Sequence, residues 1–108
     1  MAPSGSPAPE GGADPIGPPA GITQTVTIRN QRGLHARAAA KFVKLAAQFE
    51  ADIEVARNDT VVCGQSIMGL MMLAASPGSQ ITLSACGRDA AIAITSLIDL
   101  IERKFDED

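Results

Sequence analysis

The chain has 108 residues and a formal net charge of −3, so it holds one domain at most. It has no Trp or Tyr and only three Phe, which excludes an aromatic platform for single-stranded nucleic acid. The acidic balance also argues against nucleic-acid binding in general. The longest apolar run, Ile67 to Ala75, is far shorter than the roughly 20 residues of a membrane helix, so no membrane association is expected.

Residues 1–21 differ in composition from the rest of the chain. They hold six of the seven prolines and five of the ten glycines, and almost no large apolar side chains. Such a segment cannot bury enough surface to offset its conformational entropy, so a disordered extension is predicted there. It also lacks the basic start and the apolar stretch of a signal peptide. The predicted domain is therefore residues 22–108.

The first half of this domain is predicted to contain a strand, a helix and two further strands. Ile22–Ile28 alternates between apolar and polar residues, as a half-buried strand does. Arg37–Phe49 places apolar residues at helical spacing, namely Ala39, Phe42, Val43, Ala46 and Phe49. Asp52–Arg57 alternates again, and Thr60–Gly64 is a short return strand after a tight turn at Asn58-Asp59.

The second half continues with a helix, a strand and a last helix. Ser66–Ala75 is predicted as a short helix with Ser66 as its N-cap, followed by a turn at Ser76-Pro77-Gly78. A strand with Ile81 and Leu83 pointing inward comes next. Asp89 is expected to cap the final helix, whose apolar face consists of Ala90, Ile94, Leu97, Ile98, Ile101 and Phe105.

The order is thus β-α-β-β-α-β-α, which predicts an α+β domain. Because the helices are amphipathic and the strands alternate, we expect one sheet with all helices on one face. The other face of the sheet would be rich in Thr and Ser and would contact water.

The segment from Arg29 to Lys41 joins the first strand to the first helix and carries the candidate chemistry. His35, the only histidine of the chain, falls at or just before the helix start. The first N–H groups of a helix have no partners within it and stabilise an anion. Arg37 adds a guanidinium group that suits a phosphate, and Gly33 permits a close backbone approach. His35 is therefore either a nucleophile toward a phosphoryl group or merely a capping or surface residue.

Two sequence blocks resemble a known family. Gly33-Leu34-His35-Ala36-Arg37 is similar to the active-site motif of the histidine-containing phosphocarrier (HPr) family of the phosphoenolpyruvate-dependent phosphotransferase system. Ser66-Ile67-Met68-Gly69-Leu70-Met71 is similar to the regulatory-serine segment of that family. The resemblance covers about residues 22 to 105, with Ala38 where the family usually has Pro. It implies an open-faced β-sandwich, a four-stranded antiparallel sheet of order 1-4-2-3 covered on one face by three helices.

The resemblance also implies a phosphoryl relay. His35 would accept a phosphoryl group on Nδ1 from enzyme I and pass it to an enzyme IIA domain, with Arg37 stabilising the charge. The protein would be a stoichiometric carrier rather than an enzyme, a cytoplasmic monomer without metal or other cofactor. A nitrogen-related (NPr-type) branch, which regulates target proteins according to its phosphorylation state, is the alternative. A free-standing enzyme is disfavoured, because the sequence places no second acid or base near the motif and has no Gly-rich nucleotide loop.

Ser66 has two possible roles. As a helix N-cap it has a structural task that needs no further explanation. The resemblance instead implies phosphorylation by an HPr kinase/phosphorylase. A phosphoserine there would add about −1.5 to −2 charges next to a basic surface.

The short helix after Ser66 is apolar nearly all round, so it is either unusually covered or exposes a methionine-rich patch. The resemblance favours the patch and implies that Ile67, Met68 and Met71 join Arg37 and Lys44 in contacting partners.

The remaining features have simpler interpretations. Cys63 and Cys86 are expected to be reduced and semi-buried, and a zinc site is not expected. Residues 106–108 are predicted to be a solvated tail that frays. The net charge of −3 conceals a basic region, because residues 22–48 hold five basic side chains and no acidic one. The partners are therefore expected to be acidic.

Overall fold

The structure is a computed structural model that describes residues 21–107. Its strands are β1 (Ile22–Thr27), β2 (Asp52–Arg57), β3 (Thr60–Cys63) and β4 (Gln80–Cys86). Its helices are α2 (Ala36–Ala46), α3 (Ile67–Met72) and α4 (Ala90–Glu102), followed by a short turn of 3-10 helix, η1 (Lys104–Asp106). The predicted extension at residues 1–20 lies outside the described residues.

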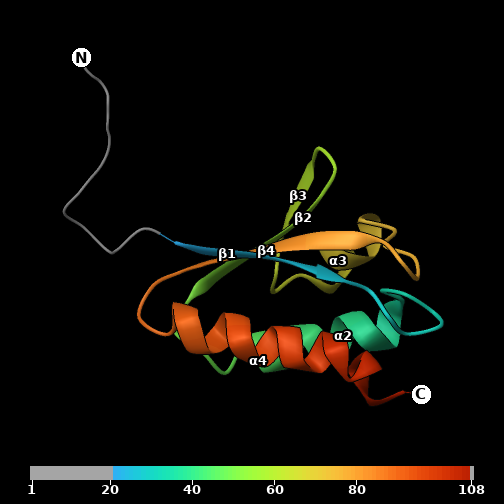
Figure 1. Cartoon of the computed structure of the whole chain (residues 1–108). Coiled ribbons are helices and arrows are strands. Elements are labelled where there is room, and N and C mark those ends of the chain that lie inside the picture. Colours follow the sequence, from blue (N-terminus) through green and yellow to red (C-terminus); the bar gives the residue numbers. More distant parts are fainter. Residues whose placement is uncertain (1–20, 108) are drawn as a thin grey trace.

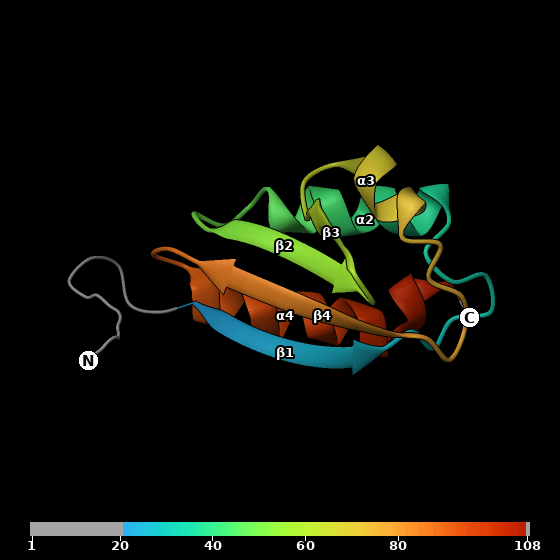
Figure 2. The same ribbon diagram turned by 90° about the horizontal axis from the view of Figure 1, so that it is seen from above.

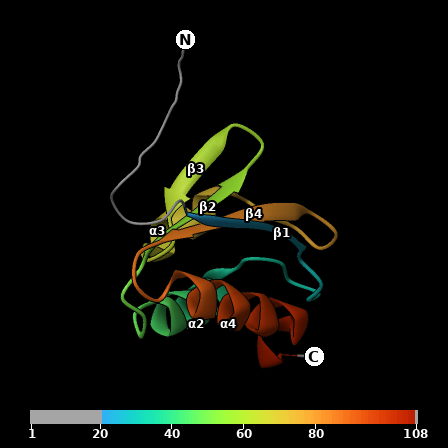
Figure 3. The ribbon, with the colours of Figure 1, turned by 60° about the vertical axis from the view of Figure 1, so that its left-hand side comes forward.

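The four strands form one antiparallel sheet of order β1-β4-β2-β3, with the helices on one side of it (Figures 1 and 3). The predicted fold class is thus confirmed, including the strand order that the resemblance implied. β1 pairs with β4 from Ile22 opposite Ala85 to Thr27 opposite Gln80. The turn between β2 and β3 has Asn58 at φ 55°, a left-handed conformation that Asn tolerates better than most residues.

The two faces of the sheet differ as the alternation predicted. On the face away from the helices, Thr25 and Thr82 form a side-chain hydrogen bond of 3.2 Å across β1 and β4. On the other face, apolar side chains of the strands meet those of the helices, and Phe42 and Leu97 are fully buried between them. The core also contains Val26, Ile28, Ile53, Val55, Leu70, Ile81, Leu83, Ala93, Ile94, Ile101 and Phe105.

Three helix ends differ from the prediction. α2 ends at Ala46, so Phe49 packs against the core from a turn. α3 ends at Met72 because the chain turns at Ala74, whose φ is 52°. α4 ends at Glu102, which leaves Phe105 beyond the helix although it is still buried. An apolar residue that continues the spacing of a helix's apolar face can therefore be buried even where the chain has already left the helix.

Asp89 occupies the N-cap position of α4 but does not cap the helix with its side chain. Its Oδ2 instead accepts a hydrogen bond of 2.8 Å from the backbone N–H of Glu50. The prediction of a capping side chain was wrong because the carboxylate satisfies the loop before β2 rather than its own helix.

Gly33 fixes the turn that delivers the chain from β1 to α2. Its φ is +68°, and a Cβ at this position would lie 2.4 Å from the carbonyl oxygen of Ala75. The next residue, Leu34, donates a backbone hydrogen bond of 2.9 Å to that same oxygen. Only glycine allows this close approach, which ties the segment before α2 to the loop after α3.

Candidate functional site at the start of the second helix

His35 is the N-cap residue of α2, as predicted. Its backbone is extended, with φ −79° and ψ 179°, and its carbonyl accepts the first helical hydrogen bond from Ala39. Its imidazole makes no capping hydrogen bond, and the first turn of α2 has no acidic residue. The helix start therefore keeps N–H groups that no side chain caps. The imidazole itself is 23% exposed.

The imidazole contacts a carboxylate that the sequence did not place there. His35 Nε2 lies 2.6 Å from Glu107 Oε2, although 72 residues separate the two in the chain. The Glu107 side chain is only 12% exposed. Two predictions are wrong here: the tail does not fray at Glu107, and a second acid or base does lie beside the motif.

Asn30 holds the other oxygen of this carboxylate. Its buried Nδ2 donates to Glu107 Oε1 over 3.1 Å and to the carbonyl oxygen of Gly33 over 2.8 Å. Its Oδ1 is buried without a hydrogen-bond partner within residues 21–107. The orientation of the amide is thus set by two acceptors on the Nδ2 side.

A turn after α4 brings Glu107 to the histidine. Lys104, Phe105 and Asp106 have φ values of 60°, 56° and 60°, a left-handed conformation that costs L-residues energy. Two contacts tie this turn to the core and to α2: the Phe105 side chain is fully buried, and its carbonyl oxygen accepts a 2.7 Å hydrogen bond from Lys41 Nζ. Figure 2 shows the C-terminal end of the chain beside the loop that precedes α2.

Two opposing effects act on the ionisation of Glu107. Burial raises the pKa of the carboxyl group, whereas the hydrogen bonds from Asn30 and His35 and the charge of Lys41 lower it. The hydrogen bonds and charges prevail together, so the pKa of Glu107 is lowered from its ordinary value of 4.5. Glu107 is therefore an ionised acceptor at neutral pH.

A basic groove lies next to this pair. It has a volume of about 380 Å³ and is lined by Gln31, Arg32, Arg37, Lys41, Asp106 and Glu107. Arg37 is exposed at the second position of α2, and within the described residues its guanidinium makes no ion pair. The structure thus brings a half-buried imidazole, a carboxylate and an unpaired guanidinium to one end of the molecule, an arrangement suited to an anionic group.

Ser66 is the N-cap of α3, as predicted. Its Oγ accepts a hydrogen bond of 3.0 Å from the backbone N–H of Gly69. A Cβ on Gly69 would lie 3.2 Å from that Oγ and 3.1 Å from Val62 Cβ, so a glycine leaves room here. The capping role is thus present in the structure.

The methionines of α3 form an exposed patch, which resolves the two alternatives for this helix. α3 lies beside α2 (Figure 2). Its Leu70 side chain is fully buried. On the opposite side, Met68 and Met72 are 71% and 72% exposed, and Ile67 and Met71 are 40% and 42% exposed. Lys44, predicted to contact partners, is exposed in the last turn of α2.

The cysteines and the second groove stand apart from this site. Both thiols are free, but Cys63 is exposed on the edge strand β3, so the prediction of semi-burial holds only for Cys86. Within residues 21–107 no cluster of three or more His, Cys, Asp or Glu could hold a metal ion.

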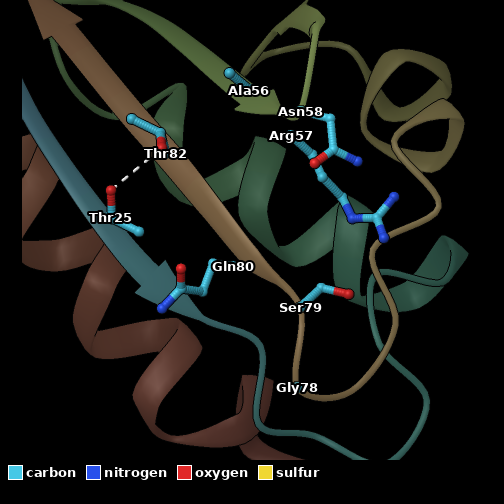
Figure 4. A pocket seen from close by; sticks show the side chains of 8 residues that line it. All are labelled: Thr25, Ala56, Arg57, Asn58, Gly78, Ser79, Gln80 and Thr82. Atoms are coloured by element: carbon cyan, nitrogen blue, oxygen red, sulfur yellow. Dashed lines mark hydrogen bonds between the residues drawn. The ribbon is translucent and has the colours of Figure 1, made fainter.

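A polar groove of about 560 Å³, between Thr25, Thr82 and Arg57, lies at one end of the strands (Figure 4). It contains no residue of the predicted site.

Fold and site together define a class of small α+β protein that presents its one histidine at a helix N-terminus beside an arginine. Residues 22–103 match the family model described as the PTS HPr component phosphorylation site. The chain therefore belongs to the HPr family of phosphocarrier proteins.

Individual relatives agree with this assignment. The chain is 49% identical over 86 residues to phosphocarrier protein HPr of Neisseria meningitidis, which covers 80% of this chain and 97% of that protein. It is 41% identical to phosphocarrier protein NPr of Shewanella violacea, over 80% and 94% of the two chains. An HPr structure from Thermoanaerobacter tengcongensis matches with a TM-score of 0.78 and 46% identity, over 81% and 98%. A second structure of that HPr, described as a dimer, has a TM-score of 0.63 and 48% identity, over 74% and 92%.

Proposed function

We propose that His35 receives a phosphoryl group from phosphohistidine on enzyme I and passes it to an enzyme IIA domain. The observation that carries the proposal is the position of His35 at the uncapped start of α2, next to the exposed Arg37, in a chain of the HPr family. Transfer of this kind needs positioning and charge stabilisation rather than further covalent chemistry. His35 is the nucleophile, and Arg37 with the helix N-terminus stabilises the transferred group.

Labelling tests this proposal directly. Enzyme I and radiolabelled phosphoenolpyruvate should transfer label to the wild-type chain, and the label should be stable to alkali and labile to acid, as expected for phosphohistidine. His35→Ala should take up no label from enzyme I. Arg37→Glu should slow both uptake and transfer to an enzyme IIA domain. Arg88→Glu is a matched charge reversal at an exposed arginine paired with Glu50, and it should behave as the wild type. Label on His35→Ala would refute the assignment.

We also propose that Ser66 is the target of an HPr kinase/phosphorylase. The capping hydrogen bond from Gly69 uses a lone pair of Oγ, and Ser66 is only half-buried and directly precedes α3, which carries the methionine patch. A phosphate there would place about −1.5 to −2 charges beside partner-binding side chains, and it would repel acidic partners. Incubation with the purified kinase and ATP should label wild-type protein but not Ser66→Ala. A wild-type chain that stays unlabelled would remove this proposal.

The second candidate function is an NPr-type regulatory module, favoured by the identity to NPr of Shewanella violacea. Such a module would bind target proteins according to the phosphorylation state of His35. The two functions differ in kinetics: the carrier in sugar transport needs fast transfer from phospho-His35 to an enzyme IIA domain, whereas the module needs only state-dependent binding. Comparing the transfer rate with the binding of the phosphorylated and unphosphorylated forms separates them.

The proposed setting is the bacterial cytoplasm, with the protein acting as a monomer and without nucleic acid. None of the helices in residues 21–107 has the length and hydrophobicity needed to cross a bilayer. Because one HPr structure is described as a dimer, the monomer is tested by sedimentation at the concentrations used for phosphoryl transfer. A stable dimer under those conditions would contradict it.

A further inference from the structure

The contact between His35 and Glu107 has a chemical consequence for the imidazole. An ionised carboxylate can only accept hydrogen bonds, and both oxygens of Glu107 are engaged, one by Asn30 and one by His35 Nε2. At 2.6 Å, Nε2 must therefore carry a hydrogen that it donates to Oε2. Since a neutral imidazole has a single ring proton, Nδ1 then holds a free lone pair.

Nothing in the described structure competes for that lone pair. Neither the backbone of α2 nor a side chain among residues 21–107 makes a hydrogen bond to Nδ1. The carboxylate, in contrast, is held from several sides: Asn30 is fully buried, the turn is tied to α2 through Lys41, and Phe105 is anchored in the core. The position of Glu107 is thus set by contacts that do not involve the imidazole.

We propose that Glu107 is a positioning residue that keeps the ring proton of His35 on Nε2 and thereby leaves a lone pair on Nδ1, the nitrogen that the resemblance to the family implies as the phosphoryl acceptor. This inference rests on the proposed phosphorylation of His35 and adds a residue to it. This role explains why a carboxylate lies within a site that otherwise attracts anions, because Glu107 contacts the ring at Nε2 and not at the reacting nitrogen Nδ1.

The transfer step balances without any movement of a proton on this chain. The Nδ1 lone pair of His35 forms a bond to phosphorus, and the phosphorus–nitrogen bond of the donor phosphohistidine breaks with its electron pair returning to the donor ring. His35 then carries the phosphoryl group on Nδ1 and a positive charge on a ring that is still protonated at Nε2. The Glu107 carboxylate next to Nε2 stabilises that cation. Onward transfer reverses these changes, and the electron pair returns to Nδ1.

Nitrogen NMR tests the inference in the unphosphorylated protein. His35 is the only histidine of the chain, so its ring signals need no assignment by mutagenesis. At pH 8 we expect a protonated, pyrrole-type Nε2, a pyridine-type Nδ1 and a slowly exchanging, downfield-shifted Nε2 proton. Glu107→Gln offers one oxygen and one NH₂ group to two donors, so the Nε2 proton should exchange rapidly and the two tautomers should mix. Glu102→Gln, the same change at the exposed partner of Arg29, should leave all three signals unchanged.

Kinetics give the second measurement. Glu107→Gln should slow phosphoryl uptake from enzyme I by about tenfold, the lower end of the losses found when the carboxylate that orients a metal-bound histidine is removed, and Glu107→Asp should restore part of the rate. Glu102→Gln should match the wild type. A proton on Nδ1 in the wild-type protein, or unchanged ring signals or uptake in Glu107→Gln, would overturn the role of Glu107. The wild-type spectrum decides even if the variant does not fold. Failure of His35 to take up label would overturn the proposed phosphorylation instead, because the tautomer is measured without it.

Discussion

Lys41 on α2 donates a hydrogen bond of 2.7 Å to the main-chain carbonyl of Phe105, in the turn after α4. This contact joins the helix that begins at His35 to the segment that carries Glu107. The left-handed conformation of residues 104–106 is unfavourable on its own, and it is offset by this bond, by the buried Phe105 ring and by the ion pair between Arg103 and Asp106. The carboxylate at the histidine is therefore positioned by contacts with the core.

Removing the Lys41 hydrogen bond should loosen that turn. We expect Lys41→Met to lower the free energy of unfolding by about 1–2 kcal/mol, because the Phe105 carbonyl loses a charged donor at a partly buried position. Lys44→Met makes the same change at an exposed lysine of the same helix and should stay within about 0.5 kcal/mol of the wild type. Urea unfolding measures both, and equal losses in the two variants would argue against an anchoring role.

Glycine should relieve the backbone strain at Lys104. The side chain of Lys104 is exposed and its φ is 60°, so Lys104→Gly removes a left-handed L-residue without removing a buried contact. The strain energy that is removed is larger than the free-energy cost of the extra unfolded-state entropy that glycine brings. We therefore expect the free energy of unfolding to rise by about 0.5–1 kcal/mol. Lys44→Gly, inside α2, should instead destabilise by about 1 kcal/mol. Thermal or urea unfolding of the pair should therefore give opposite signs.

The stability that Glu107 adds should depend on pH in a defined direction. Folding lowers the pKa of this carboxyl group, so its contribution is complete above its unfolded value, about 4.5, and is lost as the pH falls through the lower folded value. The difference in unfolding free energy between wild type and Glu107→Gln should shrink as the pH falls below 4.5. Glu102→Gln serves as the control. A difference that stays constant or grows as the pH falls below 4.5 would contradict the lowered pKa of Glu107.

The methionine patch should matter for partners and not for folding. Met68 is 71% exposed, so Met68→Asp should change the unfolding free energy by no more than about 0.5 kcal/mol. It should weaken binding to both enzyme I and an enzyme IIA domain, since it places a charge in an apolar contact. Ile92→Asp makes the same kind of change at an exposed residue of α4 and should leave both affinities intact. Unfolding of Met68→Asp would show that the side chain is needed by the core.

Most of the fold could be predicted because its determinants are local. The alternation of Ile53 and Val55, and of Ile81 and Leu83, identified β2 and β4 and the face that each buries. The strand order could not be derived from periodicity, because pairing between β1 and β4 is a long-range choice, and it came from the resemblance to HPr proteins.

The site residues that lie within short sequence motifs were predicted, whereas the one that a distant segment of the chain contributes was missed. His35, Arg37 and Ser66 lie within the two motifs, and their positions at helix starts follow from the residues around them. Glu107 could not be found in this way, because its approach depends on a turn of left-handed residues that propensities disfavour. The sequence signal for this approach was Phe105, an aromatic residue near the C-terminus. Its burial in the core brings the residues that follow it close to α2.

The patch on α3 consists mainly of methionines, whose side chains are unbranched and flexible, and it contains no rigid aromatic side chain. Methionine can adapt to surfaces of different shape, so a single patch can accept several partners in turn. Such contacts lack the rigid aromatic anchors that are typical of long-lived complexes, so we expect any partner that binds this patch to dissociate quickly. A protein that must dissociate from one partner before it binds the next would exchange partners faster with a surface of this kind.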